Sequence, residues 1–396
     1  MRLASRLARP AAACALIGAK CTSIHAAPTQ SEAANGSSAQ AIAGRHADSL
    51  ATSDGRKYTL DYLDRSMVFS VWRGSGERSS FSELMAAAAT HDVVLLGETH
   101  YDAVAHKLQE IIFARLSAAR PVVLSLEMFE TDVQHVLDEY LNGLTREQDL
   151  LNDARPWANY KAAYRPMVEL AKEAGLRVVA ANAPRRYVSA IGRHGEEALG
   201  RSVWGVRAHA DLPPLPLPKP SAAYMAQLLD DPEVMPRGAQ KAGGATASSG
   251  TGGGGCPHIG LRSEQGLLAP MKLWDASMAY GIAQALAALP AHQVVHICGS
   301  DHCKAGLGIV EMLAHYRPTA SPLVIVMYPE RECHRFSPER HAGTGDFVVL
   351  TDESASSAPA PSHAGGAGTG AGADTRPLPS PPPPIGSRTT AKYIYM

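Results

Sequence analysis

The sequence lacks the features that a disulfide scaffold, a membrane protein or a nucleic-acid-binding protein requires. Its 396 residues include six cysteines, and their spacing forms neither a disulfide framework nor a zinc-knuckle pair. No apolar run approaches the roughly 20 residues that a membrane-spanning helix needs. With 37 basic and 38 acidic residues and no basic stripe, the chain is not expected to bind nucleic acid. Free, buried thiols are expected for the cysteines of the folded body.

The N-terminal segment resembles a targeting sequence. Four basic residues precede the first acidic one, Glu32, and they are Arg2, Arg6, Arg9 and Lys20. This pattern, rich in alanine and serine, is typical of a chloroplast or mitochondrial presequence, so we expect residues 1–40 to be a disordered targeting segment. A secretory signal is the alternative, because "AAACALIGA" is followed by "HAA", which resembles a cleavage site and would direct a secreted or periplasmic protein.

Two further segments contain too few apolar residues to fold. Residues 353–396 consist mainly of glycine, alanine, serine and proline, so we expect a disordered tail. Residues 236–256, which include "GGATASSGTGGGG", are expected to be a flexible insertion. The remaining body, residues 58–352, is long enough to build one large hydrophobic core.

Within this body, short apolar runs alternate with helical patterns, which indicates an α/β domain with a mainly parallel sheet flanked by helices. A helical excursion is expected between Arg185 and Leu289, and no internal repeat is present. Helices are expected around residues 108–116 and 132–144, before Gly175 and at residues 265–289. Strands are expected at residues 93–97, 122–127, 176–182, 293–299 and 323–328, with a last, edge strand at 346–350.

Polar residues follow four of these predicted strands. In open α/β sheets, ligands bind at the carboxyl ends of the strands, so residues at these ends are expected to converge. They are Glu98 and His100 after the first strand, Glu127 after the second, Asn182 after the third and His302 after "QVVHICG". The sequence therefore predicts one functional edge.

Two of the strand ends share the pattern Gly-x-x-His, at Gly97 to His100 and at Gly299 to His302. Glycine permits a tight turn where a strand leaves the sheet, and the histidine can then reach over the edge. Two imidazoles with Glu98 could bind a divalent metal together with Glu127, or act as a general acid and base around a water.

Structural roles remain open for several of these residues. His100 and His302 could cap helices, and Glu127 could cap the next helix together with Thr131. Asn182 could stabilise the turn before Pro184.

Three more residues near the motifs have structural alternatives. Asp275 could form a buried ion pair with Arg185 or Arg186 instead of contacting a ligand. Asp102 is expected to start a helix, which would place His106 on another face in a structural role.

A set of motifs resembles the haem-binding uptake domain of the ChaN type, in the Tiki and erythromycin-esterase superfamily. The motifs are "VVLLGETHYDAVAHKLQ", "SLEMFE", "WANYKAAYRPMVELAKEAG", "VVAANAPRRYV", "KLWDASMAYGIAQAL" and "HICGSDHCKAGLG", and the resemblance extends from about Ser80 to Leu350. It implies an α/β domain with its site at the Gly-x-x-His edge. ChaN-type relatives are associated with haem binding and iron acquisition, and more distant relatives with metal-dependent proteolysis or ester hydrolysis.

The resemblance also implies which residues form the site. The matched positions are Glu98, His100, Glu127, Asn182, Pro184, Arg185, Asp275 and His302. Unlike bacterial ChaN proteins, this chain has a basic presequence without a lipobox, a glycine-rich insertion and a proline-rich tail.

Haem or another tetrapyrrole is thus the expected ligand and cofactor, and a homodimer is compatible with the sequence. Haem iron accepts a tyrosinate, a histidine or a thiolate as axial ligand. Candidates are Tyr224, Tyr187, His258 and Cys256, beside Asn182, Arg185 and Asp275 as further contacts. The alternative is a metal-dependent hydrolase that uses Glu98, His100, Glu127 and His302 to activate a water.

Overall fold

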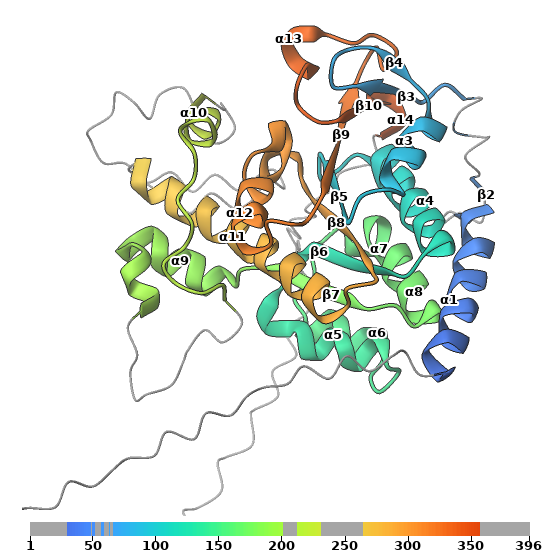
Figure 1. The fold of residues 1–396 in the computed structure, drawn as a ribbon, viewed down its shortest axis with the longest axis horizontal. Coiled ribbons are helices and arrows are strands. Elements are labelled where there is room, and N and C mark those ends of the chain that lie inside the picture. Colours follow the sequence, from blue (N-terminus) through green and yellow to red (C-terminus); the bar gives the residue numbers. More distant parts are fainter. Residues whose placement is uncertain are drawn as a thin grey trace, which may run out of the picture. The chain divides into compact units, whose positions relative to one another are not determined.

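An eight-stranded sheet in the order β4-β3-β10-β9-β5-β8-β6-β7 forms the centre of the fold (Figure 1). The computed structural model describes residues 30–48, 50–51, 57–58, 63, 66–200, 212–230 and 264–356. From β10 to β7 every neighbouring pair is parallel, whereas β3 and β4 are antiparallel to their neighbours. The predicted α/β class with a mainly parallel sheet is confirmed.

The six predicted strands all form. They are β5 (Val93–Glu98), β6 (Val122–Glu130), β7 (Val178–Asn182), β8 (Gln293–Gly299), β9 (Pro322–Glu330) and β10 (Phe347–Asp352). The expectation that β10 is an edge strand is wrong, because a hairpin of β3 (Phe69–Arg73) and β4 (Arg78–Ser79) pairs with its outer side. A separate two-stranded sheet joins β1 (Leu50–Ala51) to β2 (Lys57–Tyr58).

Helices cover both faces of the sheet (Figure 1). One face carries α1 (Gln30–Asp48), α3 (Phe81–Ala88), α4 (Ala103–Ala119), α5 (Gln134–Leu141) and α8 (Arg165–Ala174). The other carries α9 (Arg185–His194), α10 (Ala222–Asp230), α11 (Glu264–Ala288) and α12 (Ile309–Tyr316). The shorter helices are η1 (Thr131–Val133), α6 (Glu147–Asp153), α7 (Tyr160–Ala163), η2 (Glu196–Gly200), η3 (Ser300–His302), η4 (Lys304–Gly306), α13 (Pro338–His341) and α14 (Glu353–Ser356).

The two faces of the sheet bury two separate hydrophobic clusters. On β5, Val94 and Leu96 belong to one cluster, and Val93 and Leu95 belong to the other. This division follows from the strand geometry, in which successive side chains point to opposite faces. Because both faces are covered by helices, the central strands are continuous apolar runs.

Two predicted helix ends have the expected geometry. Asp102 is the N-cap of α4, where its Oδ1 accepts hydrogen bonds of 3.0 Å from the backbone N–H groups of Val104 and Ala105. Gly175 follows α8 in the left-handed conformation, with φ 65°. Both positions use residues suited to them, a short carboxylate at the start and a glycine at the end.

Two described helices fall inside the predicted terminal segments. Helix α1 begins at Gln30, within the residues expected to form the targeting segment. The helix is held because it packs on α4 and α8, where Ala43 is completely buried. The first residues of the predicted tail form α14. Residues 1–29, the insertion at 236–256 and residues 357–396 lie outside the described residues.

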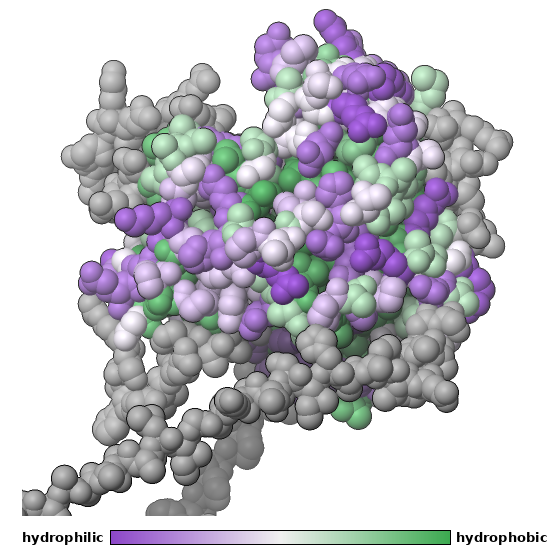
Figure 2. Space-filling view, in the orientation of Figure 1, coloured by the Kyte–Doolittle hydropathy of each residue, from purple (hydrophilic) through white to green (hydrophobic). Residues whose placement is uncertain are grey.

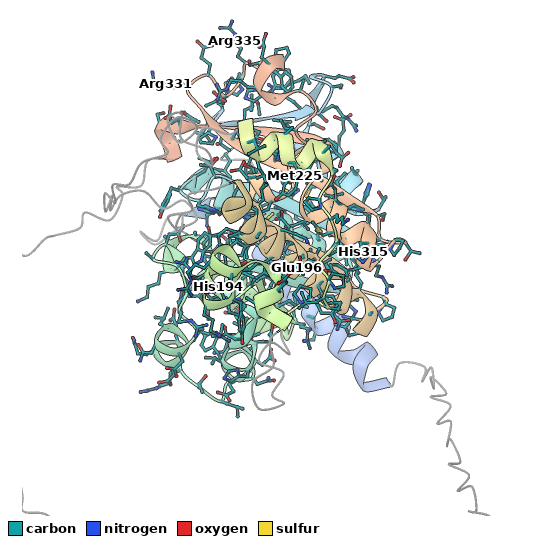
Figure 3. All side chains as sticks on the ribbon, turned by 90° about the vertical axis from the view of Figure 1, so that its left-hand side faces the viewer. His194, Glu196, Met225, His315, Arg331 and Arg335 are labelled. Atoms are coloured by element: carbon teal, nitrogen blue, oxygen red, sulfur yellow. The ribbon has the colours of Figure 1, made fainter. Side chains whose placement is uncertain are left out.

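The helical excursion predicted between Arg185 and Leu289 contains α9, η2, α10 and α11. Glu196 helps to hold it together, because it accepts a 2.6 Å hydrogen bond from Lys272 Nζ and another of 2.6 Å from the backbone N–H of Leu217. Figure 3 views this face, with Glu196 labelled between His194 of α9 and His315 of α12. Within the part of the chain that is described, no helix is both long and apolar enough to cross a membrane.

The polar end of the domain lies around α13. Figure 2 shows hydrophilic side chains over this end, and Figure 3 labels Arg331 and Arg335 there. Each arginine has a nearby acidic partner, Glu353 at 3.3 Å for Arg331 and Glu332 at 3.2 Å for Arg335.

A close backbone contact shapes the ends of β5 and β8. A Cβ atom added to Gly97 would lie 2.8 Å from Sγ of Cys303 and 3.0 Å from Cα of Ser300. Only glycine therefore lets the turn after β8 pack directly against β5. The first Gly-x-x-His motif needs its glycine for this approach.

Replacement of Gly97 by alanine should lower the free energy of unfolding by about 1–3 kcal/mol, because the added methyl group overpacks this contact. Urea unfolding would measure the change. Gly200→Ala is the control, since a Cβ atom at Gly200 meets none of the described residues within 4 Å. Equal effects of the two substitutions would contradict this explanation.

Candidate functional site

The polar strand ends converge as the sequence predicts. Strands β5, β8, β6 and β7 are consecutive neighbours in the sheet. All four run parallel, so their carboxyl ends lie at the same edge. This edge carries Glu98 of β5, His302 after β8, Glu127 of β6 and Asn182 of β7.

Glu98 is the most highly connected carboxylate of this edge. Its side chain is completely buried, and it accepts hydrogen bonds from Tyr164 Oη at 2.5 Å, Gln109 Nε2 at 2.8 Å and His100 Nδ1 at 3.0 Å. Burial alone would raise the pKa of Glu98, but His106 and His100 outweigh it and hold this pKa well below its ordinary value. The carboxylate is therefore ionised and its geometry is tightly constrained.

His106 belongs to this network. Its Nδ1 lies 3.3 Å from Oε2 of Glu98 and its Nε2 lies 3.1 Å from the carbonyl oxygen of His100. Burial lowers the pKa of His106, but the Glu98 carboxylate raises it more, so the pKa is above its usual value. The expectation that His106 lies on a face away from the motif is wrong, because the first turn of α4, which begins at Ala103, brings its ring to Glu98 and to the carbonyl oxygen of His100.

The second histidine of the motif pair also has a carboxylate partner. His302 Nδ1 lies 2.6 Å from Oδ1 of Asp275, a completely buried residue of α11. Tyr224 donates its hydroxyl hydrogen to Oδ2 of the same carboxylate. The alternative that Asp275 pairs with Arg185 or Arg186 is wrong, because Asp275 faces the interior whereas both arginines are exposed at the start of α9.

Glu127 lies on β6, beside His302 and the end of β8. Its Oε2 accepts a 2.7 Å hydrogen bond from the backbone N–H of Gly299, and its Oε1 lies 3.7 Å from Nε2 of His302. The predicted helix cap shared with Thr131 is not formed, since Oγ1 of Thr131 has no hydrogen-bond partner. Glu127 instead ties β6 to the end of β8.

The two imidazoles approach each other over Gly299. A Cβ atom at this glycine would lie 3.1 Å from Nε2 of His100 and 3.7 Å from Cδ2 of His302. Any side chain here would displace His100, so the second motif glycine makes room for the first motif histidine. The edge therefore holds two carboxylate-backed imidazoles, Glu98 with His100 and Asp275 with His302.

A loop at residues 154–159 crosses this edge. Asn159 Nδ2 donates a 2.7 Å hydrogen bond to the carbonyl oxygen of His100, and Trp157 packs edge-on against the His100 ring at 4.7 Å. Arg155 has φ 52°, a left-handed conformation that is unusual for a residue with a side chain. The loop therefore holds an indole against His100.

A surface hollow opens beside His100. It has a volume of about 100 Å³, and most of its lining surface is apolar. Its exposed aromatic side chain is Tyr101, with an exposed fraction of 49%. The lining residues are His100, Tyr101, Ala103, His106, Lys107, Glu110, Asn159, Ala162 and Ala163.

The geometry suits proton transfer and ligand binding. A carboxylate that holds Nδ1 of an imidazole orients the ring and favours a proton on that nitrogen, which directs Nε2 to a substrate or an ion. Among the described residues, no three histidine, cysteine or acidic side chains are grouped so as to hold a metal ion. The predicted metal site of Glu98, His100, Glu127 and His302 stays a prediction.

The candidate haem ligands occupy different environments. Tyr224 is completely enclosed, and burial, together with Asp275, raises the pKa of its phenol well above the ordinary value. Tyr187 of α9 is half-buried, with the guanidinium of Arg186 4.4 Å from its ring centre. His258 and Cys256 lie outside the described residues. The expected free, buried thiols are confirmed for Cys298, Cys303 and Cys333.

Sequence reasoning missed four residues of this edge, Tyr101, Gln109, Trp157 and Tyr164. Tyr101 directly follows the first motif histidine, which was a usable signal. Trp157 and Tyr164 belong to the quoted motif "WANYKAAY", but nothing in that segment indicates that its aromatic residues contact a strand end far away in the sequence.

Comparison with known proteins gives one family and a related fold. The family described as haem-binding uptake, Tiki superfamily, ChaN matches residues 84–313. A solved structure of ChaN from Campylobacter jejuni, whose description reports cofacial haem binding, has a TM-score of 0.51 with 17% identity and covers 72% of this chain and 97% of its own. This similarity shows the shared fold.

A type III effector, HopBA1, is more distant, with a TM-score of 0.37 and 13% identity over 68% of this chain and 91% of its own. At this level of similarity, the HopBA1 structure is not informative about the site of the present chain. No curated protein matches the chain at a significant level.

Glu98 should make the stability of the protein depend on pH. Its pKa is lower in the folded protein than the ordinary value of 4.5, so its contribution is complete above that value and is lost as the pH falls below it. We expect the wild-type free energy of unfolding to fall by about 2 kcal/mol more than that of Glu98→Gln on acidification below pH 4.5. Urea unfolding from pH 7 to pH 3 would measure this, and parallel curves would contradict the assignment.

Proposed function

The chain belongs to the ChaN family of haem-binding uptake proteins in the Tiki superfamily, and on this basis we propose that it binds haem or a related tetrapyrrole. The proposed site is the hollow beside His100 at the carboxyl edge of the sheet. The observation that carries the proposal is an exposed phenol, Tyr101, at the mouth of a mainly apolar hollow.

The hollow is too small to enclose a tetrapyrrole, but its apolar lining offers a contact surface for one edge of the macrocycle. A macrocycle needs apolar contacts for its faces and edges, which Ala103, Ala162 and Ala163 offer. Haem iron needs an axial ligand, and a tyrosinate is one of the ligands that proteins use. Bound haem would supply an iron centre for storage or exchange of the cofactor.

Tyr101 is the best-placed axial ligand. Its phenol is half exposed, so it can reach an iron atom without any rearrangement of the core. Tyr224 lacks this property, because it is buried and donates its hydrogen to Asp275. A tyrosine must lose that hydrogen to bind ferric iron, and the burial of Tyr224 opposes the loss.

Replacement of Tyr101 by phenylalanine should weaken haem binding at least tenfold, because the ring stays but the ligand oxygen is lost. Titration of the full-length chain with haemin, followed in the Soret region, would give the dissociation constants. Tyr280→Phe is the matched control, since this hydroxyl on α11 accepts a 3.1 Å hydrogen bond from Gln284 Nε2 and lies in the helix layer on the other face of the sheet from α4. Unchanged binding by Tyr101→Phe would overturn Tyr101 as the ligand.

The second candidate function is hydrolysis of an amide or ester. The observation in its favour is the pair of carboxylate-backed imidazoles, at 3.0 Å for Glu98 and His100 and at 2.6 Å for Asp275 and His302. Such groups can take a proton from a water and return it to a leaving group. A divalent ion bound by the same side chains would lower the pKa of that water.

The hydrolase proposal predicts that His302→Ala loses at least about a hundredfold in hydrolytic rate while it remains folded, because the general acid–base group is removed. Panels of ester and peptide substrates, assayed with and without added divalent ions, would test it, and circular dichroism would verify the fold. His315→Ala, an exposed histidine of α12, is the control. A wild-type chain that hydrolyses none of these substrates while it binds haem would remove this candidate.

A further inference from the structure

Three arginines and two carboxylates form a cluster beyond the ends of β6 and β7. Arg155 contacts Glu130 at 2.9 Å and Asp132 at 2.6 Å, both through one nitrogen. Arg185 lies 3.7 Å from Glu130, and Arg186 contacts Asp132. We refer to Arg155, Arg185 and Arg186 as the arginine cluster.

The cluster adjoins the candidate site. Glu130 lies three residues beyond Glu127 on β6, a separation of roughly 10 Å along an extended strand. On the other side, the loop at residues 154–159 joins Arg155 to Trp157, which packs on His100 at 4.7 Å. A ligand at the sheet edge can therefore reach both His100 and the cluster.

The arginine cluster has donor groups to spare. The side chains of Arg155, Arg185 and Arg186 are 50%, 56% and 53% exposed. Each contacts its carboxylates through one nitrogen, whereas a guanidinium carries five N–H donors in a planar fork. The free donors of these planar forks fit a carboxylate in a bidentate manner.

The position of the arginines is unfavourable for the fold alone. Arg185 and Arg186 occupy the first turn of α9, the positive end of the helix dipole, where cations are destabilising. The N-cap is Pro184, which makes no side-chain cap hydrogen bond. Arg155 adds backbone strain with its φ of 52°. An anionic ligand would offset both costs.

Unsatisfied oxygen atoms lie beside the cluster. Asn182 is the register partner of Glu130, is 9% exposed, and its Oδ1 has no hydrogen-bond partner. Oγ1 of Thr131, the residue after Glu130, has none either. A water that donates to Asn182 Oδ1 has a second hydrogen to donate to a ligand carboxylate.

We propose that Arg155, Arg185 and Arg186 bind the carboxylate groups of the ligand that occupies the sheet edge. The inference rests on the proposed function, under which these groups are the propionates of haem. Arg155 and Asp132 also line a hollow with Glu139, Asp149 and Asp153, which repels anions and leaves Arg185 and Arg186 as the side that a carboxylate can approach.

Haem and haem dimethyl ester differ only in the propionates, which are charged in haem and uncharged in the ester. A comparison of the two affinities therefore measures the contribution of the propionate charges. Each compound is titrated into the full-length wild-type chain, the double variant Arg185→Gln/Arg186→Gln, and Arg146→Gln as control. Arg146 is an exposed arginine on another helix that is also paired with a carboxylate, Asp149, at 2.9 Å. Absorbance in the Soret region gives the dissociation constants, and thermal unfolding gives the stability.

The wild-type chain should bind haem at least tenfold more tightly than the ester. The double variant should bind haem only as tightly as the ester, with ester binding unchanged. Its melting temperature should stay the same or rise, because two cations are removed from the positive end of α9. Arg146→Gln should resemble the wild type in every measurement.

Four outcomes would overturn the inference. A wild-type chain that binds haem and ester equally would overturn it alone and leave haem binding in place. A double variant that retains wild-type affinity for haem, or loses affinity for both compounds alike, would do the same. A wild-type chain that binds neither compound would overturn the proposed function and this inference together.

Discussion

The buried carboxylate of Glu98 is the constraint on which the rest of the site depends. A charge enclosed by protein is stable only when several donors surround it, and here the donors come from β5, α4 and α8 or their flanking turns. This requirement fixes the ring of His100 and the first turn of α4. Hydrogen bonding of Glu98 by Tyr164 also joins the sheet to the segment that carries Trp157. The hollow beside His100 therefore has rigid walls.

Two glycines allow the two histidines to approach each other at this edge. Gly97 lets the turn after β8 approach β5, and Gly299 leaves space for the His100 ring. The two motifs are thus complementary, since the glycine of each one accommodates a neighbour that the other supplies. Asp275 and Tyr224 then place His302, in the same way as Glu98 and Tyr164 place His100. The site has two similar halves that come from distant parts of the sequence.

The sequence predicted those features that depend on local pattern. The apolar runs of β5 and β8, the cap at Asp102 and the four polar strand ends were all foreseeable, because strand period, capping chemistry and parallel topology are local or general rules. Contacts set by packing were not foreseeable. The partner of Asp275 depends on which face of α11 meets the sheet, and the place of β10 depends on a hairpin formed some 270 residues earlier in the chain. The short strand β3 has a polar residue between its apolar ones, so it lacks the continuous apolar run by which the other strands were predicted.

The hydrogen bond from Thr351 to Asp102 links the last strand to the N-cap of α4. Asp102 therefore has two structural roles, because its Oδ1 caps the helix and its Oδ2 accepts a hydrogen bond from Thr351. The edge that carries Tyr101 is therefore complete only after β10 has joined the sheet, so a strand far along the chain is as necessary to this edge as the motif that precedes α4.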